Sequence, residues 1–241
     1  AISDTKEKKL SAKRLLICSG VTERIVSFPG WTTPGVIGLA ASTNLLKSQQ
    51  LLPSQKPIIA GSGPLLYAVA AAIISNGGKP LAMADLGSKF DWLLSLPNLL
   101  LSPVLLMKGL FWRAKILWAG VPVFHRHHVA SVHGGDKVET VELTPINKNG
   151  APLPNKKNKK FFSDSLIVGH GLVPSLEITR LLKAKHSYHP ERGGWVPEVD
   201  QFQRTSVPSL YVAGDCGGIS GAETAVLSGT IAGLQISFDA G

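Results

Sequence analysis

A glycine turn between a short apolar strand and a long apolar segment is the feature that most constrains this chain. The run Ile58–Ala60 is typical of a buried parallel strand, and residues 65–75 have the apolar spacing of a helix. The turn between them is Gly61-Ser62-Gly63-Pro64, and a second apolar run, Leu81–Ala84, ends at Asp85. Such a βαβ unit brings backbone N–H groups and the positive end of a helix dipole to one edge of a sheet. The pattern therefore predicts a nucleotide-binding site.

Asp85 and Leu66 bear on what this βαβ unit binds. Asp85 lies 22 residues after Gly63, where dinucleotide-binding units carry an acid that binds a ribose hydroxyl. Because a carboxylate repels a 2′-phosphate, Asp85 favours NAD or another adenine nucleotide over NADP. Leu66 stands where the usual glycine fingerprint has a small residue, so an ordinary βα unit that binds no ligand stays an alternative.

Composition and charge indicate a globular chain without a nucleic-acid partner. Its 241 residues suffice for one or two domains, and 44% of them are hydrophobic while 17% are charged. The net charge is +9, but the basic runs at 6–13 and 156–160 contain no interleaved aromatic residues. We therefore interpret both runs as solvated segments.

The positions of cysteine and histidine give no metal or redox motif. Cys18 and Cys216 belong to no C-x-x-C pair, which favours a reduced, cytosolic setting. On a single strand His125 and His127 share one face while His128 points away, and no carboxylate joins them at a suitable spacing. We therefore interpret these histidines as surface strand residues and expect no metal site.

One apolar stretch, residues 92–112, is long enough to suggest a membrane span. Pro97, Pro103, Lys108 and Gly109 interrupt it, so we expect two short helices that pack against the rest of the fold. Membrane contact is expected to be peripheral at most, and the expected location is the cytoplasm, with the inner face of the membrane as the alternative. The N-terminus has neither a signal peptide nor an initiator methionine, which indicates a piece of a longer chain.

Three further apolar runs end in glycine turns, at Ser19-Gly20, Gly169-His170-Gly171 and Gly214-Asp215. Ligands of open α/β sheets bind at the carboxyl ends of strands, so these turns are candidate site residues. Asp215 offers an acceptor for a ribityl hydroxyl, and a helix that begins at Gly221-Ala222 offers N–H donors to an anionic flavin edge. The alternatives are an Asp215 that only caps that helix and a His170 that only binds backbone rather than lining a flavin site.

The rest of the pattern predicts mixed helices and strands with a polar loop at residues 147–160. Helices are expected at residues 35–46, 176–182 and 222–234. Strands are expected at residues 14–18, 120–124, 161–168 and 210–213, and a hairpin joins residues 129–132 to 137–144 across Gly134-Gly135-Asp136. Residues 189–203 are expected to be irregular.

Separated motifs along nearly the whole chain resemble one group of flavoproteins. Residues 15–20 and 206–215 resemble the Ala-Thr-Gly strand end and the C-terminal flavin motif of proteins with two dinucleotide-binding domains, the thioredoxin reductase-like group. Within that group, the similarity is closer to the flavin subunits of opine oxidase, hydrogen cyanide synthase and heteromeric proline or hydroxyproline dehydrogenases. The runs that carry it are residues 28–36, 61–66, 169–175 and 193–197, and Leu66 belongs to that subfamily's own fingerprint.

The resemblance implies an α/β, Rossmann-like three-layer fold. A nucleotide domain at residues 55–163, with a helical insert at 89–119, is inserted into an FAD domain made of residues 1–54 and 164–241. That FAD domain is expected to be incomplete, because the family's first glycine fingerprint has no counterpart here. The implied cofactor is FAD, with NAD or another adenine nucleotide in the second site. The expected cofactor-binding residues are Ser19, Gly20, Gly61, Gly63, Pro64, Leu65, Asp85, His170, Gly214, Asp215, Gly221 and Ala222.

Three functions fit these expectations. The resemblance implies a flavin subunit of a heteromeric amine or amino-acid dehydrogenase, whose FAD carries electrons from a second flavin-containing subunit to a further acceptor. A stand-alone NAD(P)H-dependent flavin oxidoreductase comes second, because the chain shows no thiol pair for disulfide reduction. The third is a truncated, non-catalytic nucleotide-binding fragment, which a flavin absorbance spectrum would distinguish from the other two.

Overall fold

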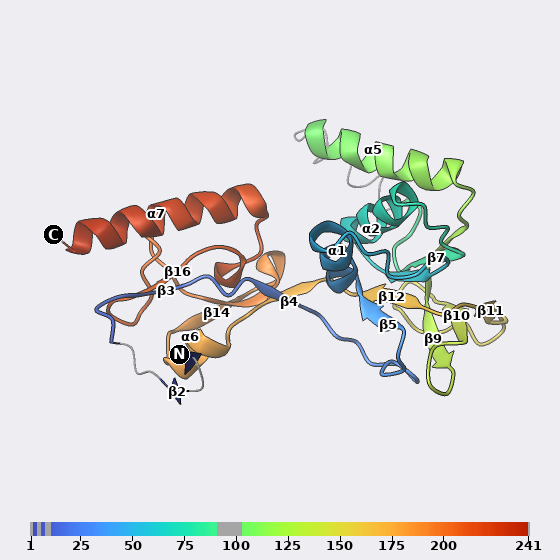
Figure 1. The fold of residues 1–241 in the computed structure, drawn as a ribbon, viewed down its shortest axis with the longest axis horizontal. Coiled ribbons are helices and arrows are strands. Elements are labelled where there is room, and N and C mark those ends of the chain that lie inside the picture. The colour runs from blue at the N-terminus through green and yellow to red at the C-terminus, as the bar shows by residue number, and fades with distance from the viewer. Residues whose placement is uncertain (1, 4–5, 8–10, 91–102, 241) are drawn as a thin grey trace. The chain divides into compact units, whose positions relative to one another are not determined.

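The computed structural model describes residues 2–3, 6–7, 11–90 and 103–240. Its contacts divide the chain into two units (Figure 1). Residues Glu23–Gly171 form one, which we call the central unit. Residues Ala1–Thr22 and Leu172–Gly241 form the other, which we call the terminal unit.

Within its described residues, the central unit is built on five parallel strands in the order β5-β12-β6-β7-β8. The predicted strand, turn, helix and strand are confirmed, since β6, α2 (Pro64–Ser75) and β7 form a βαβ unit. β12 pairs with the other side of β6, so the strand order reverses there. The strands are β5 (Val36–Gly38), β12 (Leu166–Gly169), β6 (Ile58–Gly61), β7 (Ala82–Asp85) and β8 (Val123–His125).

Helices cover one face of this sheet and a second sheet covers the other. The helices α1 (Leu39–Ser48), α2 and α5 (Pro103–Trp118) pack on the face that carries Ile59, Met83 and Ile167. The antiparallel strands β9 (His127–His133), β10 (Thr140–Pro145) and β11 (Lys159–Phe162) pack on the face that carries Ile58 and Leu166. Because successive strand residues point to opposite faces, burial of both faces requires the uninterrupted apolar runs seen in the sequence. The predicted three-layer α/β fold is confirmed.

Short strand pairs and helices make up the terminal unit. β3 (Leu15–Ile17) and β16 (Leu210–Val212) pair in parallel. Their side chains Ile17, Leu210 and Val212 form a small core together with Cys216. The other strand pairs are β14 (His186–His189) with β15 (Gly194–Pro197), β13 (Leu172–Pro174) with β4 (Val21–Glu23), and β1 (Ile2–Ser3) with β2 (Lys6–Glu7). The last residue of β4, Glu23, is the first residue of the central unit. The helices are α6 (Glu177–Leu181) and α7 (Ala222–Ala240), with 3-10 turns at Pro190–Arg192 and Asp215–Gly217.

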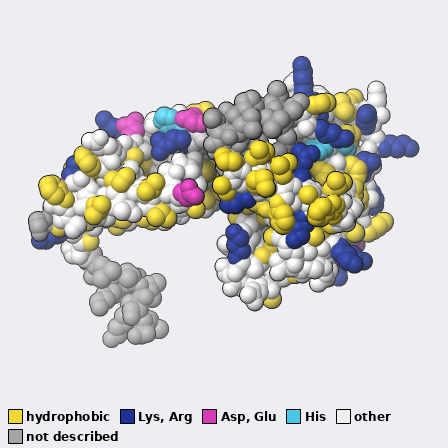
Figure 2. Space-filling view, turned by 90° about the horizontal axis from the view of Figure 1, so that it is seen from above, with side chains coloured by type: hydrophobic (Ala, Val, Ile, Leu, Met, Phe, Trp, Pro, Cys, Tyr) yellow, Lys and Arg dark blue, Asp and Glu magenta, His cyan; other side chains and the backbone are white. Residues whose placement is uncertain are grey.

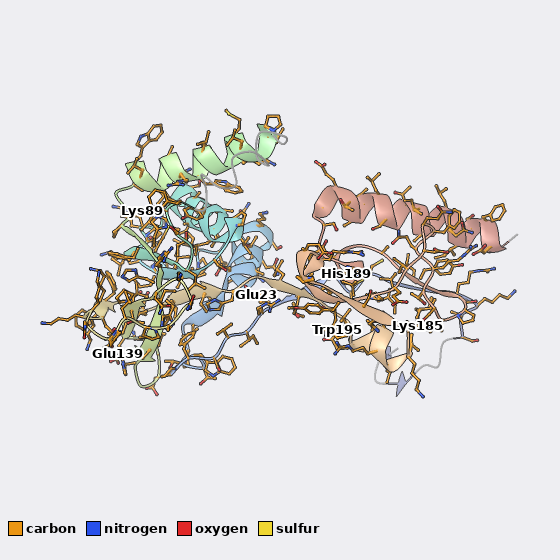
Figure 3. All side chains as sticks on the ribbon, turned by 180° about the vertical axis from the view of Figure 1, so that it is seen from behind. Glu23, Lys89, Glu139, Lys185, His189 and Trp195 are labelled. Carbon is orange, nitrogen blue, oxygen red and sulfur yellow. The ribbon has the colours of Figure 1, made fainter. Side chains whose placement is uncertain are left out.

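By their contacts β5 and α1 belong to the central unit, whereas the predicted segments assign them to the FAD domain, and that assignment stays a prediction. β5 pairs in parallel with β12, and Leu39 at the start of α1 is buried in the core shared with α2. Glu23 adds to this attachment, since its carboxylate accepts a hydrogen bond of 2.7 Å from the Ala40 N–H at the start of α1 (Figure 3). Pairing between distant segments sets this boundary, so composition along the chain could not show it.

Three predicted elements need correction. The helix expected at 35–46 begins at Leu39, because Val36–Gly38 forms β5. The strand expected at 161–168 is two strands of different sheets, β11 and β12, and between them Ser163 Oγ lies 2.9 Å from the carbonyl oxygen of Lys56. Residues 189–203 were expected to be irregular, but β15 forms a hairpin with β14. Across that hairpin the ring centroids of Tyr188 and Trp195 lie 5.7 Å apart.

The helical insert also differs from the prediction. α5 runs without a break from Pro103 through Lys108 and Gly109, which were expected to interrupt it. Pro103 stands in the first turn, where its missing N–H costs no intrahelical hydrogen bond. The first of the two predicted helices falls on residues 91–102, outside the described residues. In the part of the chain that the structure describes, no helix has the length and apolar character needed to cross a membrane.

Candidate functional site

Two glycines face each other at the carboxyl ends of β6 and β12. Gly61 pairs with Gly169, and the Ser62 N–H donates a hydrogen bond of 3.1 Å to the Gly169 oxygen. A Cβ atom on Gly61 would lie 1.9 Å from that oxygen, and one on Gly169 would lie 2.5 Å from Leu39 Cδ1. Gly61, predicted as a cofactor-binding turn residue, thus also allows the close approach of two strands.

Gly63 has a different role in the same turn. Its φ of +82° is in the region that favours glycine, and a Cβ atom there would meet no atom within 4 Å. Pro64 is the first residue of α2, and Leu66 is fully buried in the core between helices and sheet. The start of α2 at Pro64 and Leu65 is therefore open above Gly63, while the bulky Leu66 is used for packing.

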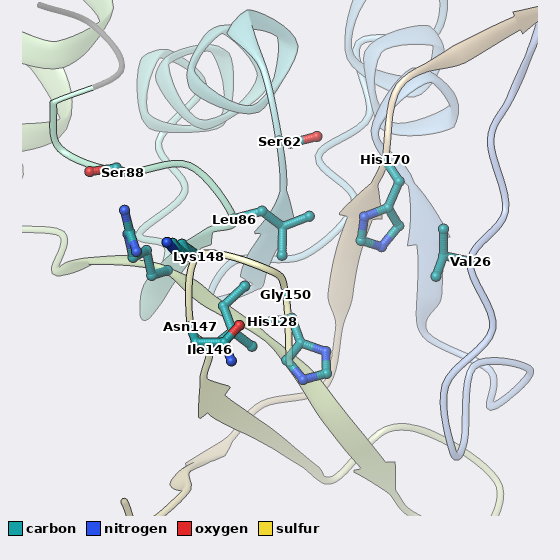
Figure 4. Close-up of a pocket in the computed structure, with 11 residues that line it drawn as sticks. Val26, Ser62, Leu86, Ser88, His128, Ile146, Asn147, Lys148, Gly150 and His170 are labelled. Carbon is teal, nitrogen blue, oxygen red and sulfur yellow. The ribbon is translucent and has the colours of Figure 1, made fainter. Parts of the chain in front are cut away.

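A pocket of about 530 Å³ lies within the central unit at this edge of the sheet (Figure 4). One wall comes from the residues that follow strands, namely Ser62 after β6, Leu86 and Ser88 after β7, and His170 after β12. Ligands of α/β sheets bind where the strand order reverses, which here is the crevice between β6 and β12. The other lining residues are Val26, Arg126, His128, Ile146, Asn147, Lys148 and Gly150.

Two histidines line this pocket as neutral imidazoles (Figure 4). Burial lowers the pKa of His128 from its ordinary value of 6.5, and the neighbouring His127 adds to that shift. Burial and the nearby His128 likewise lower the pKa of His170. The Nε2 atom of His128 is buried and has no hydrogen-bond partner among the described residues. Since a neutral imidazole has one donor and one acceptor nitrogen, His128 can bind a polar group of a ligand.

The lining of the pocket is electropositive. Arg126 and Lys148 belong to it, whereas no Asp or Glu stands among the described residues that line it. Arg126 is held in place by its backbone, because its N–H donates to the Gly87 oxygen at 3.1 Å and its own oxygen accepts from the Ile146 N–H at 2.8 Å. Its φ of +52° is rare for a residue other than glycine. These features suit the pocket to an anionic ligand.

Arg126 also changes the interpretation of the histidine run. Because it separates β8 from β9, the expected placement of His125 and His127 on one face of a single strand is wrong. His127 Nδ1 instead lies 2.8 Å from the His125 carbonyl oxygen. Within the described residues, no group of three or more His, Cys, Asp or Glu residues is arranged to hold a metal ion.

Asp85 ends β7 but is not among the residues that line the pocket. Asp85 is 5% exposed. Its Oδ2 accepts a hydrogen bond of 2.6 Å from Tyr67 Oη, and its Oδ1 accepts one of 2.8 Å from the Gly87 N–H. His125 Nδ1 lies 3.5 Å from Oδ2, and burial lowers the pKa of this histidine, so its ring is neutral. The predicted ribose contact stays a prediction. Each Asp85 oxygen can accept a further hydrogen bond, but the low exposure of the residue leaves little room for a ribose hydroxyl to reach it.

The predicted flavin-side residues meet at the ends of β3 and β16 in the terminal unit. Ser19 Oγ donates a hydrogen bond of 3.0 Å to the Ser175 oxygen, and the Ser175 N–H donates one of 3.0 Å to the Gly20 oxygen. Asp215 Oδ1 accepts a hydrogen bond of 3.2 Å from the Ser220 N–H, which closes the loop before α7. Gly214 and Gly221 have φ values of +77° and +90°, and Ala222 begins α7. His170, in contrast, belongs to the central unit and its pocket.

The sequence matches one family over most of its length. Residues 2–229 match the family described as pyridine nucleotide-disulphide oxidoreductase. The chain belongs to this family. The match confirms the family predicted from the motifs, which is a family of oxidoreductases that use FAD and pyridine nucleotides.

Individual relatives of this pyridine nucleotide-disulphide oxidoreductase chain are longer than it is. Hydrogen cyanide synthase subunit HcnB of Pseudomonas protegens is 30% identical over 237 residues, which cover 97% of this chain and 50% of that protein. An opine oxidase subunit of Rhizobium meliloti is 30% identical over 237 residues, which cover 97% of this chain and 43% of that protein. The chain thus spans about half the length of these curated relatives. A thioredoxin reductase of T. acidophilum shares the fold, with 20% identity and a TM-score of 0.66 over 95% of this chain and 66% of its own.

The pocket residues that the sequence analysis missed lie mainly on the wall formed by β9 and β10. Arg126 precedes β9, while Asn147 and Lys148 follow β10. β9 and β10 are antiparallel, and His127 pairs with Pro145, so the residues that flank the hairpin meet at one end. Basic residues immediately outside a predicted hairpin were the signal that could have found this wall.

Proposed function

We propose that this chain forms the cofactor-binding part of an FAD-dependent dehydrogenase subunit. The subunit would work in a heteromeric enzyme that oxidises a C–N bond of an amine or amino acid, such as an opine or proline. The family match supports the flavin chemistry, and the relatives are named as subunits of hydrogen cyanide synthase and opine oxidase. A second flavin-containing subunit would oxidise the substrate, and a separate acceptor would receive the electrons. The enzyme would be located in the cytoplasm or at the inner face of the membrane. The chain's own residues would hold and orient the cofactors.

The pocket of the central unit is the observation that carries this proposal. It lies at the carboxyl ends of β6, β7 and β12, and its lining includes Ser62 of the turn that precedes α2. We propose that it takes NAD or another adenine nucleotide. The turn at Gly63 and the start of α2 would face the phosphates, Arg126 and Lys148 would neutralise their charge, and the neutral His128 would bind a hydroxyl or base nitrogen.

Replacing Arg126 with Gln should weaken nucleotide binding by about tenfold, which corresponds to one lost hydrogen bond to a charged group. NADH fluorescence and calorimetric titrations with NADH, ATP and inorganic pyrophosphate measure this. Lys137→Gln is the matched control, because it removes one positive charge beyond the other end of β9, outside the pocket. If the Arg126→Gln and Lys137→Gln variants bind the probes equally well, the pocket is not the nucleotide-binding site. If the wild type binds none of the three probes, the chain has no nucleotide-binding site.

The terminal unit is proposed to contribute one edge of the FAD site. Asp215 would accept a hydrogen bond from the ribityl chain, while Gly214, Gly221 and the start of α7 at Ala222 would offer backbone groups to the flavin. Ser19 and Gly20 would lie opposite, at the end of the adjacent strand β3. When bound, FAD would supply the electron-transfer chemistry of the enzyme.

Asp215→Asn should reduce FAD affinity by about tenfold, because it removes the charge that strengthens the hydrogen bond to a ribityl hydroxyl. The measurement is the visible absorbance of flavin retained after titration of the purified full-length protein with FAD. Glu177→Gln in α6 removes one exposed negative charge from the same unit and serves as the control. Equal flavin retention by the two variants would remove Asp215 from the site, and absence of flavin from the wild type would contradict the FAD proposal.

The thiols favour this proposal over a disulfide reductase. Cys18 and Cys216 are both free. Cys216 is buried, and its thiol contacts the carbonyl oxygens of Ile17 at 3.5 Å and Ala213 at 3.2 Å. Partial burial, together with Cys216, raises the pKa of the Cys18 thiol, so it stays protonated at neutral pH. A protonated thiol is a poor nucleophile for disulfide exchange.

A further inference from the structure

The solvent-facing side of α5 is apolar, which is the reverse of an ordinary surface helix. Ile116 is 2% exposed and packs with Trp112 into the core of the central unit. Six other side chains of α5 are hydrophobic and more than half exposed. The exposed fractions are 64% for Val104, 67% for Met107, 53% for Leu110, 61% for Phe111, 75% for Leu117 and 85% for Trp118. We call this set the outer face of α5.

The groups beside the outer face are cationic. α5 contains Lys108, Arg113 and Lys115 but no Asp or Glu. Lys108 and Lys115 are seven residues apart, which puts them on the same side of the helix, along one border of the outer face. Lys115 Nζ lies 5.6 Å from the Phe111 ring centroid, so the charge stands directly beside the apolar surface. Figure 2 shows hydrophobic side chains gathered over this region with basic side chains at its borders.

We propose that the outer face of α5 docks on an anionic lipid surface. Apolar side chains that include Phe, Leu and Trp, bordered by lysines, match the composition of helices that lie in the membrane interface. With 16 residues α5 is about 24 Å long, shorter than the hydrocarbon core of a bilayer, so it would lie along the surface. Lys108 would reach the lipid headgroups while Met107, Phe111 and Trp118 enter the acyl boundary. Lys115 Nζ donates a hydrogen bond to Ser75 Oγ of α2, so this lysine would add positive charge beside the apolar surface from a fixed position.

Charge and polarity favour lipid over a protein on this face. The α5 of a second copy would offer no acid to compensate the lysines of the first, because the helix contains no Asp or Glu. A different protein would need polar groups to fix its orientation, and the outer face offers no hydrogen-bonding side chain apart from the indole of Trp118. Docking on an anionic lipid surface requires only apolar side chains that insert and basic side chains that attract the headgroups, and this face combines the two.

The test is co-sedimentation of the full chain with vesicles of phosphatidylcholine alone and of phosphatidylcholine mixed with phosphatidylglycerol. We expect binding to the mixed vesicles that decreases as NaCl is added, because salt screens the lysine–headgroup attraction. The double substitution Met107→Gln with Phe111→Gln should weaken binding at least tenfold, and Lys108→Gln should weaken binding to the mixed vesicles several-fold. Both variants should keep the wild-type circular dichroism spectrum, since these side chains are exposed.

A matched control comes from α7, whose Leu227 and Leu234 are 63% and 68% exposed. This helix contains Glu223 and Asp239 and no basic residue, so Leu227→Gln with Leu234→Gln should leave vesicle binding unchanged. The proposal is overturned if the wild type binds neither vesicle, or if the α5 and α7 variants bind equally well. It is also overturned if light scattering shows a dimer that only the α5 variant dissociates, because a second copy would then occupy the face.

Discussion

Replacing Gly61 with Ala should destabilise the central unit by about 3 kcal/mol or more, among the largest effects expected of a single methyl group. The added Cβ would lie 1.9 Å from the Gly169 oxygen, and the φ of Gly61 is +147°. Neither obstacle can be relieved by turning a side chain, because both involve backbone. β6 and β12 would have to separate, and they form the centre of the sheet. Urea denaturation followed by tryptophan fluorescence and far-UV circular dichroism measures the loss, with the two units treated as separate transitions.

Gly63→Ala is the matched control for this prediction, two residues away in the same turn. It meets open space, so only its φ of +82° opposes an alanine, and we expect a cost of about 1 kcal/mol. The same change should weaken nucleotide binding, because the methyl group fills the space through which a phosphate would approach. Equal stabilities of the two variants would mean that the contact between β6 and β12 is looser than the structure shows.

Asp85→Ala should cost the central unit about 2–4 kcal/mol. The buried carboxylate accepts hydrogen bonds from the Tyr67 hydroxyl and the Gly87 N–H, and the substitution removes the acceptor for both. Gly87 lies between Leu86 and Ser88, which line the pocket, so the variant should also lose nucleotide affinity through a displaced turn. Equilibrium denaturation and NADH titration of the same preparations measure the two effects.

Tyr67→Phe and Asp85→Asn separate the structural role of Asp85 from a ribose contact. Tyr67→Phe keeps the hydrogen bond from the Gly87 N–H to Asp85, so we expect a smaller loss of stability than for Asp85→Ala and an unchanged NADH affinity. In a double-mutant cycle Tyr67→Phe and Asp85→Asn should be clearly non-additive, because their side chains share one hydrogen bond. If Asp85→Asn instead loses at least tenfold in NADH affinity without losing stability, the carboxylate contacts the ribose and its role is not structural.

Much of the βαβ unit was predictable because its signals are local. The apolar runs at Ile58–Ala60 and Leu81–Ala84 have no polar position, and burial of both strand faces requires this. The glycines at 61 and 63 are dictated by backbone geometry within a single turn. Periodicity and turn chemistry act over a few residues, so β6, α2 and β7 were identified almost to their ends.

The opposite wall of the pocket could not be derived in the same way. Arg126, His128 and Lys148 meet the turn at Ser62 only because the hairpin of β9 and β10 packs on one face of the main sheet. A strand pattern states which side chains share a face but not which sheet that face will cover. The same limit explains why the sequence analysis interprets His125, His127 and His128 as surface strand residues.

The sequence by itself determined the family, the βαβ unit and the glycine turns at strand ends, since each depends on residue types close together in the chain. Tertiary structure alone decided that β12 lies beside β6, that β5 belongs to the central unit, and that the outer face of α5 stays exposed. It also placed Tyr67 where its hydroxyl donates a hydrogen bond to the carboxylate of Asp85. The physical reason is that these outcomes depend on pairing and burial between segments far apart in the chain. No local pattern records which distant surface a strand or helix will meet.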